Sequence, residues 1–90
     1  MEKNKFYIIT YNNDFGNFYY IVEYLDHDNM LLNAITIKFL RKYLDKDHYS
    51  NFYYNSIIYI NQINIIYESY VLDDCVSKIK LLYDVDIYNL

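Results

Sequence analysis

One stretch, residues 30–46, carries the clearest helical period in the chain and constrains the fold more than any other segment. Its apolar residues recur at about 100° per residue, the period of an amphipathic helix. Asp26 and Asp28 precede the stretch, where side-chain oxygens cap free backbone N–H groups and suit the positive end of the helix dipole. We therefore predict a central helix over residues 30–46. Its apolar arc consists of Leu32, Thr36, Ile37, Phe39, Leu40, Tyr43 and Leu44.

A β-hairpin is predicted ahead of this helix. Residues 5–11 are rich in β-branched and aromatic side chains and are too few for a helix. Residues 12–17 combine Asn, Asp and the only glycine, as a turn requires, and residues 18–25 form the return strand. Both faces of this hairpin are largely apolar or aromatic. It is therefore either covered on both sides or leaves a tyrosine-rich face for a partner.

The second half of the chain repeats this order. Residues 52–70 have strand character with a break at Asn61 and Gln62, and form either a hairpin or one strand of about twelve residues. Usual strand lengths of about five or six residues favour the hairpin. Apolar residues then recur at helical spacing over residues 72–83, with Asp73 or Asp74 as the cap. The tail, residues 84–90, alternates weakly and allows a short edge strand.

The predicted fold is therefore α+β, a small antiparallel sheet of two hairpins with two helices, in the order ββαββα. Ninety residues form a single compact domain over residues 1–90, with one small core. Two short helices cover only one side of such a sheet, so we expect a homodimer or an obligate partner on the other side.

Composition places the chain among cytoplasmic proteins, in the host cytoplasm if a virus or phage encodes it. No apolar run is long enough to span a membrane, and no signal-peptide core follows Met1, so no membrane association is expected. The single cysteine, Cys75, excludes an internal disulfide and fits a reducing compartment.

No pattern in the sequence favours catalysis, a cofactor or a metal site. Asp26, His27 and Asp28 form one acidic cluster and Asp45, Asp47 and His48 another, but their spacing is not that of a zinc or calcium site. Cys75 lies on the apolar arc of the second helix next to two acids, which favours a buried structural thiol over a nucleophile. A chain with one glycine also has no glycine-rich phosphate loop. We therefore expect no enzyme activity.

Four basic residues would share the outer arc of the central helix, namely Lys38, Arg41, Lys42 and Lys46. Such a face can bind phosphate, which makes a small dimeric nucleic-acid-binding regulator an alternative function. The formal net charge is −4, however, so the whole protein would not attract nucleic acid. We interpret these residues as the solvated side of an amphipathic helix and expect no direct nucleic-acid binding.

Tyrosine is the residue type with the clearest functional meaning. Fourteen tyrosines cannot all be buried in so small a core, and exposed tyrosine is enriched where proteins bind proteins. An AT-rich genome is the alternative source of the excess. No Lys or Arg occurs in residues 6–37 or 47–77, where acids surround the tyrosines. The carboxylates in and around these segments are Asp14, Glu23, Asp26, Asp28, Asp47, Glu68, Asp73 and Asp74.

These features predict a non-enzymatic protein-binding module. In type, the chain resembles the small acidic inhibitors of phages and mobile elements, such as anti-CRISPR and anti-restriction proteins, although no motif in it matches a named family. The resemblance implies a host protein as partner, one that handles nucleic acid and whose binding surface the inhibitor occupies. A self-associating structural subunit is a further alternative. The expected contact residues are Tyr19, Tyr20, Glu23, Tyr24, Asp26, Asp28, Glu68 and Tyr70.

Overall fold

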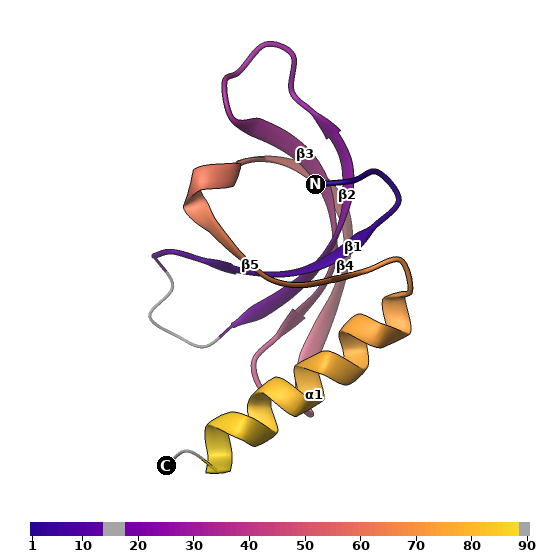
Figure 1. The fold of residues 1–90 in the computed structure, drawn as a ribbon, viewed down its shortest axis with the longest axis vertical. Coiled ribbons are helices and arrows are strands. Elements are labelled where there is room, and N and C mark those ends of the chain that lie inside the picture. Colours follow the sequence, from indigo (N-terminus) through magenta and orange to yellow (C-terminus); the bar gives the residue numbers. More distant parts are fainter. Residues whose placement is uncertain (14–17, 89–90) are drawn as a thin grey trace.

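The computed structural model describes the backbone of residues 1–13 and 18–88, and the side chains of these residues up to Asp84. This part of the chain contains five strands, one short 3-10 helix and one α-helix (Figure 1). In chain order they are β1 (Phe6–Tyr11), β2 (Tyr19–His27), β3 (Ala34–Tyr43), β4 (Tyr49–Tyr59), the 3-10 helix η1 (Ile60–Gln62), β5 (Ile63–Ser69) and α1 (Leu72–Tyr88).

All five strands form one antiparallel sheet in the order β4-β3-β2-β1-β5. β4 and β5 are therefore the two edges, yet only the three residues of η1 join them. In a flat sheet the edges would lie about 19 Å apart, whereas the backbone from Tyr59 to Ile63 spans at most about 14 Å. The sheet must curl at this end, and Figure 1 shows it as a partly open ring. Asn12 N–H donates to the Gln62 carbonyl at 2.9 Å, which continues the β1–β5 pairing as far as η1.

The inner face of the curled sheet encloses the larger core. Every second residue of a strand points inward, and these residues are β-branched, aliphatic or aromatic. Tyr7 and Ile9 come from β1, and Val22 and Tyr24 from β2. The remaining members of this inner core are Ile35, Ile37, Phe39, Ile58 and Ile63.

A second core lies outside the sheet, where α1 packs against β1 and β5. Residues that alternate with those of the inner core point to this side, among them Ile8 and Ile21. α1 contributes Cys75 and Ile79, both 0% exposed. Leu40 and Tyr43 of β3 complete this outer core. The middle of the sheet is thus buried on both faces.

The predicted central helix is wrong, because residues 34–43 form the strand β3. Ile35, Ile37 and Phe39 alternate into the inner core as strand residues do. Leu40, directly after Phe39, lies on the outer side by ordinary alternation, and a register shift between Phe39 and Arg41 then places Tyr43 in the outer core as well. A bulged strand buried on both faces therefore has apolar residues at three- and four-residue spacings, which imitates a helix.

The order ββαββα is corrected to five strands followed by one helix. The first hairpin and the helix after residue 71 are present, but the tail through Tyr88 is helical and adds no edge strand. The break predicted at Asn61 and Gln62 is present as η1. The strands that flank it do not pair with each other, because β4 pairs with β3 and β5 with β1. The turn at residues 14–17 lies outside the described residues.

Candidate interaction surface

β4 is the most exposed regular element of the sheet. Eight of its eleven residues are exposed, two are partly exposed and only Ile58 is buried. Its large exposed side chains are Tyr49, Tyr53, Tyr54, Ile57 and Tyr59, with exposed fractions of 47%, 73%, 51%, 53% and 41%. No charged residue and no histidine occurs anywhere in residues 49–67. Monomeric proteins seldom leave a contiguous apolar surface uncovered, so this strand is a candidate binding surface.

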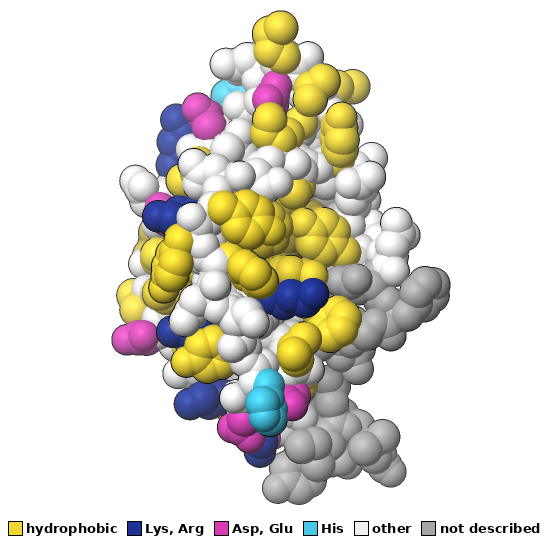
Figure 2. All heavy atoms as spheres, turned by 180° about the vertical axis from the view of Figure 1, so that it is seen from behind, with side chains coloured by type: hydrophobic (Ala, Val, Ile, Leu, Met, Phe, Trp, Pro, Cys, Tyr) yellow, Lys and Arg dark blue, Asp and Glu magenta, His cyan; other side chains and the backbone are white. Residues whose placement is uncertain are grey.

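The strand order explains why the side chains of β4 are exposed. β4 pairs with β3 along one side and ends the sheet on the other, and α1 packs at the opposite end of the strand order, on β1 and β5. Phe52 points to the inner core, so alternation along the strand places Tyr53 on the outer face. Tyr49 lies on the same face, because it pairs with Tyr43 of the outer core. Figure 2 shows the back of the molecule, where β4 lies, with hydrophobic and aromatic side chains gathered across its middle.

Ring contacts hold several of these side chains in place. Tyr54 stacks on Phe39 of the inner core with ring centroids 5.1 Å apart, and Phe52 meets Tyr54 edge to face at 5.9 Å. Tyr49 packs against Tyr43 at 5.1 Å. Because these rings are already ordered, a partner that covers them loses less side-chain entropy than it would with mobile groups. The surface is therefore preorganised for contact.

The four basic residues do not share one face. Lys38 and Arg41 point to the outer side of β3, since Lys38 lies opposite Glu23 and Arg41 opposite the outward-pointing Ile21. Lys42 lies on the other side, over the rings of Phe18 at 4.7 Å and Tyr20 at 5.6 Å. Lys46 lies in the loop after β3.

Three of these basic groups have partners within the chain. Lys46 pairs with Asp84 at 3.4 Å, and Lys42 has the ring contacts just described. Arg41 donates to the Tyr43 hydroxyl at 3.0 Å and lies 4.6 Å from the Tyr49 ring centroid. The hydrogen bond to Tyr43 raises the pKa of the guanidinium, which stays charged. Of the four basic side chains, Lys38 has the fewest contacts within the part of the chain that the structure describes.

The tyrosines predicted as anchors on β2 serve mainly to pack the protein. Tyr24 is 8% exposed and belongs to the inner core. Tyr20 is half-buried and meets Tyr11 edge to face at 5.3 Å, while Tyr19 meets Tyr83 of α1 at 5.1 Å. The sequence predicted that many tyrosines are exposed, and among the residues that the structure describes the most exposed rings lie on β4 and at Tyr70.

The structure gathers three other predicted contact residues around the N-terminal segment, where each already has a partner. Asp26 pairs with Lys3 at 3.6 Å, and Glu68 pairs with Lys5 at 3.0 Å. The Tyr70 hydroxyl donates to the Glu2 carboxylate, which raises the pKa of Tyr70 and, together with the Lys5 charge, lowers that of Glu2. Glu23 is half-buried on β2, and Asp14 lies outside the described residues. Asp26 and Glu68 therefore form local pairs within the chain.

The two acidic clusters act as loop caps. Asp45 accepts hydrogen bonds from the backbone of Asp47 and His48 and from the His48 ring, each at 2.8 Å. The same bonds lower the pKa of the Asp45 carboxyl, with the bond from Asp47 the largest cause. Within residues 1–13 and 18–84 no three His, Cys, Asp or Glu side chains converge as metal ligands would.

Cys75 has the environment expected of a structural thiol. It is 0% exposed between α1 and the sheet. Burial, together with the neighbouring Asp74 carboxylate, raises the pKa of the thiol to about 11. The reactive thiolate is therefore a minor species at neutral pH.

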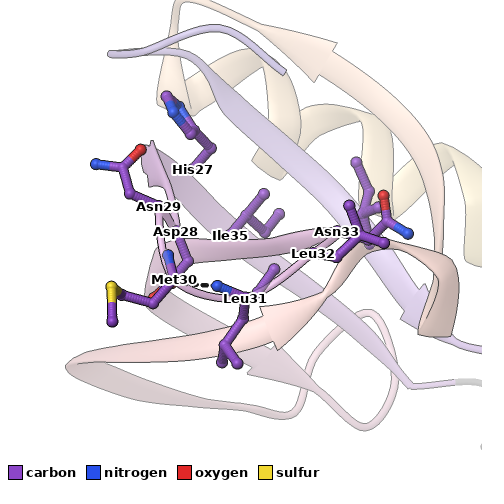
Figure 3. Close-up of a pocket in the computed structure, with 10 residues that line it drawn as sticks. His27, Asp28, Asn29, Met30, Leu31, Leu32, Asn33 and Ile35 are labelled. Atoms are coloured by element: carbon purple, nitrogen blue, oxygen red, sulfur yellow. Dashed lines mark hydrogen bonds between the residues drawn. The ribbon is translucent and has the colours of Figure 1, made fainter.

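A hollow of about 530 Å³ lies at the tip of the β2–β3 hairpin (Figure 3). Asp28 Oδ1 accepts from the backbone N–H of Met30 at 2.7 Å and of Leu31 at 2.9 Å, which folds the loop over. Asn33 takes a left-handed φ of 61°, which Asn tolerates, and its carbonyl accepts from Ile60 N–H of η1 at 2.9 Å. Met30 is 90% exposed, so the tip presents apolar side chains to solvent. The sequence missed this loop because it fell inside the predicted helix.

No protein-family model, curated protein or solved structure matches this chain at a significant level. In the part of the chain that the structure describes, no helix is both long enough and apolar enough to cross a membrane.

Proposed function

We propose that this protein is a non-enzymatic protein-binding module that engages its partner through β4. The observation that carries the proposal is the uncharged, aromatic edge strand, whose residues are exposed over most of its length. Such a strand offers a partner two kinds of contact at once. Its outer backbone groups can extend a sheet, and its tyrosine rings supply contact area.

The narrower form of this proposal is an inhibitor, encoded by a phage or mobile element, that occupies the working surface of a host protein which handles nucleic acid. Its support is the acidic net charge of −4 and the resemblance in type to such inhibitors. Because the carboxylates Asp26 and Glu68 are paired with lysines of the same chain, they carry little free charge to a partner. In this form of the proposal, ring and backbone contacts of β4 supply most of the affinity, and charge mainly excludes wrong partners.

The test is affinity capture with matched variants. Purified full-length protein, its Tyr53→Lys variant and its Leu32→Lys variant are immobilised and exposed to a lysate of the native host. Both substitutions place a lysine at a strongly exposed apolar position, 73% exposed on β4 and 87% exposed at the hairpin tip. We expect a partner that wild type and Leu32→Lys retain and Tyr53→Lys loses. Retention by all three variants would place binding elsewhere.

One observation favours a second function, binding of single-stranded nucleic acid. Lys38 and Arg41 lie on the same outer face as Tyr49 and Tyr53, and aromatic rings beside basic groups stack bases and hold phosphates. The net charge opposes this function. Fluorescence anisotropy with labelled single strands tests it, because submicromolar binding that weakens steeply with salt would favour this function over protein binding.

A further inference from the structure

We propose that a second copy of this chain is a partner of β4, through antiparallel edge-to-edge pairing of residues 49–55. The inference deepens the proposed function and rests on β4 as its binding surface. The product would be a symmetric dimer in which each copy contributes the same strand segment.

The backbone of β4 provides the first argument. In an antiparallel ladder every second residue of an edge strand directs its N–H and C=O away from its neighbour. β4 runs for eleven residues and pairs only with β3, so one row of these groups faces outward. Native proteins usually protect such an edge with charge, proline or a covering element. β4 contains neither Pro nor a charged residue.

Exposure selects the half of β4 that pairs. In residues 49–55 only Phe52 is partly buried, and the other six are exposed. At the other end of β4, Tyr59 is followed directly by η1 and then by β5 at the far edge of the sheet. The chain that leaves β4 there restricts the approach of a partner to that end. Residues 49–55 are therefore the segment with the most open approach.

The absence of charge permits pairing with a second copy and disfavours a charged partner strand. An antiparallel pair with two-fold symmetry places each residue opposite one from the same segment, so a single charge would meet itself or its near neighbour. Residues 49–55 are tyrosine, serine, asparagine and phenylalanine only. Rings would meet rings or asparagine amides, with no like charges opposite each other. An acidic or basic partner would find no opposite charge on this strand.

The available area sets the strength of the dimer. Tyr49, Tyr53 and Tyr54 are 47%, 73% and 51% exposed. A buried aromatic side chain covers roughly 150–250 Å², so these rings offer about 250–430 Å² per copy. Even with the asparagines added, the total for two copies stays below the roughly 1,200 Å² of a standard interface. The dimer is therefore weak and its population rises with protein concentration.

Sedimentation of the full-length chain tests this directly, over about 10 to 500 µM, the range in which an interface of this size should form. We expect the mass of wild type to rise from the monomer value of 11.1 kDa towards twice that value. Tyr53→Lys should weaken dimerisation at least about tenfold, because the two lysines lie close across the symmetry axis. The matched variant Leu32→Lys should dimerise as wild type does. A wild type that stays monomeric throughout, or an equal loss in both variants, would overturn the proposal.

Disulfide trapping gives an independent test of the geometry. Cysteine is placed singly at Asn51 or Tyr53, and the native Cys75 stays out of reach because it is buried. Pairing of residues 49–55 about a two-fold axis at Phe52 places Asn51 opposite Tyr53 of the other copy. A mixture of the Asn51→Cys and Tyr53→Cys chains should therefore form the mixed disulfide under mild oxidation, faster than a control cysteine at Leu32 pairs with its own copy. Trapping no faster than at Leu32 would contradict two-fold pairing.

The absence of self-pairing can be distinguished from a failure of the proposed function. A monomer whose capture of a host protein is still lost with Tyr53→Lys keeps β4 as a binding surface and removes only self-pairing. A dimer that Tyr53→Lys breaks, without any captured host protein, keeps self-pairing and reduces the function to self-association.

Discussion

The two edge strands of this sheet differ in almost every property that controls association. β5 is seven residues long, carries Glu68, and has α1 packed beside it. Lys5 bonds to Glu68, and Lys78 of α1 lies 5.5 Å from the ring centroid of Tyr67. β4 is eleven residues long, is uncharged, and has rings exposed on its outer face. One edge is protected in the usual ways and the other is not.

The difference between the two edges separates the part of the sheet that stabilises the fold from the part that is available for contact. β1, which pairs with β5, is buried on both faces by the inner core and by α1, although four of the seven residues of β5 itself are exposed. The half next to β4 has one covered face and one exposed face. Substitutions should therefore change stability in the first half and association in the second.

The largest effect should appear in thiol chemistry. In a Tyr53→Cys variant, Ellman's reagent at about pH 8 should label the β4 thiol at least about 100-fold faster than Cys75, since a free thiol has a pKa near 8.5. The raised pKa of Cys75, about 11, leaves little thiolate, and burial blocks access. Labelling of Cys75 should speed up as the pH rises towards 11 or on unfolding. Comparable rates at the two sites would mean that α1 does not cover its side of the sheet.

Removing packing between α1 and the sheet should cost the most stability. Ile79 is 0% exposed in the outer core, so Ile79→Ala should lower the free energy of unfolding by about 2–5 kcal/mol. Leu81 lies on the same helix but is 58% exposed, and Leu81→Ala should change it by less than about 0.5 kcal/mol. Urea denaturation measures both variants, and equal losses would refute the assignment of the buried helix face.

A smaller loss is expected at the loop that leads into β3. Asp28→Ala removes the acceptor of two backbone N–H groups and should cost about 1 kcal/mol, as loss of a cap does elsewhere. Asp47→Ala, at an exposed carboxylate of the β3–β4 loop, is the matched control and should have little effect. Thermal unfolding at low protein concentration measures the difference.

The smallest effect on folding should come from β4 itself. Tyr53 is 73% exposed, so Tyr53→Ala should shift the free energy of unfolding of the monomer by no more than about 0.5 kcal/mol. The same variant should lose dimer formation. A large loss of stability in the dilute protein would show that Tyr53 serves the fold, which contradicts the division between the two halves.

The sequence predicted the elements in which one local rule dominates. Residues 6–11 and 19–27 are strands, as their β-branched and aromatic residues predict. Residues after 71 are a helix, because Asp73 and Asp74 begin a run of helical period. The break at η1 could also be predicted, because Asn61 and Gln62 interrupt an apolar run.

The central helix was mispredicted because burial of β3 depends on the other elements. Period-two alternation in Ile35, Ile37 and Phe39 is interrupted by the bulge, after which Tyr43 joins Leu40 in the second core. Leu40 and Tyr43 are buried on the outer face because they share a core with residues of α1, which a local pattern in β3 does not reveal. Exposed tyrosines could also be predicted, because fourteen of them exceed what so small a core can bury. Their location on β4 depends on strand order, which local patterns do not encode.

Amide hydrogen exchange at two protein concentrations, about 10 and 300 µM, tests the central claim most directly. We expect outward-facing amides in residues 49–55 to become more protected at the higher concentration, while those of β5 do not change. Protection in β4 that is independent of concentration, or that rises equally in β5, would contradict β4 as the edge through which this protein binds.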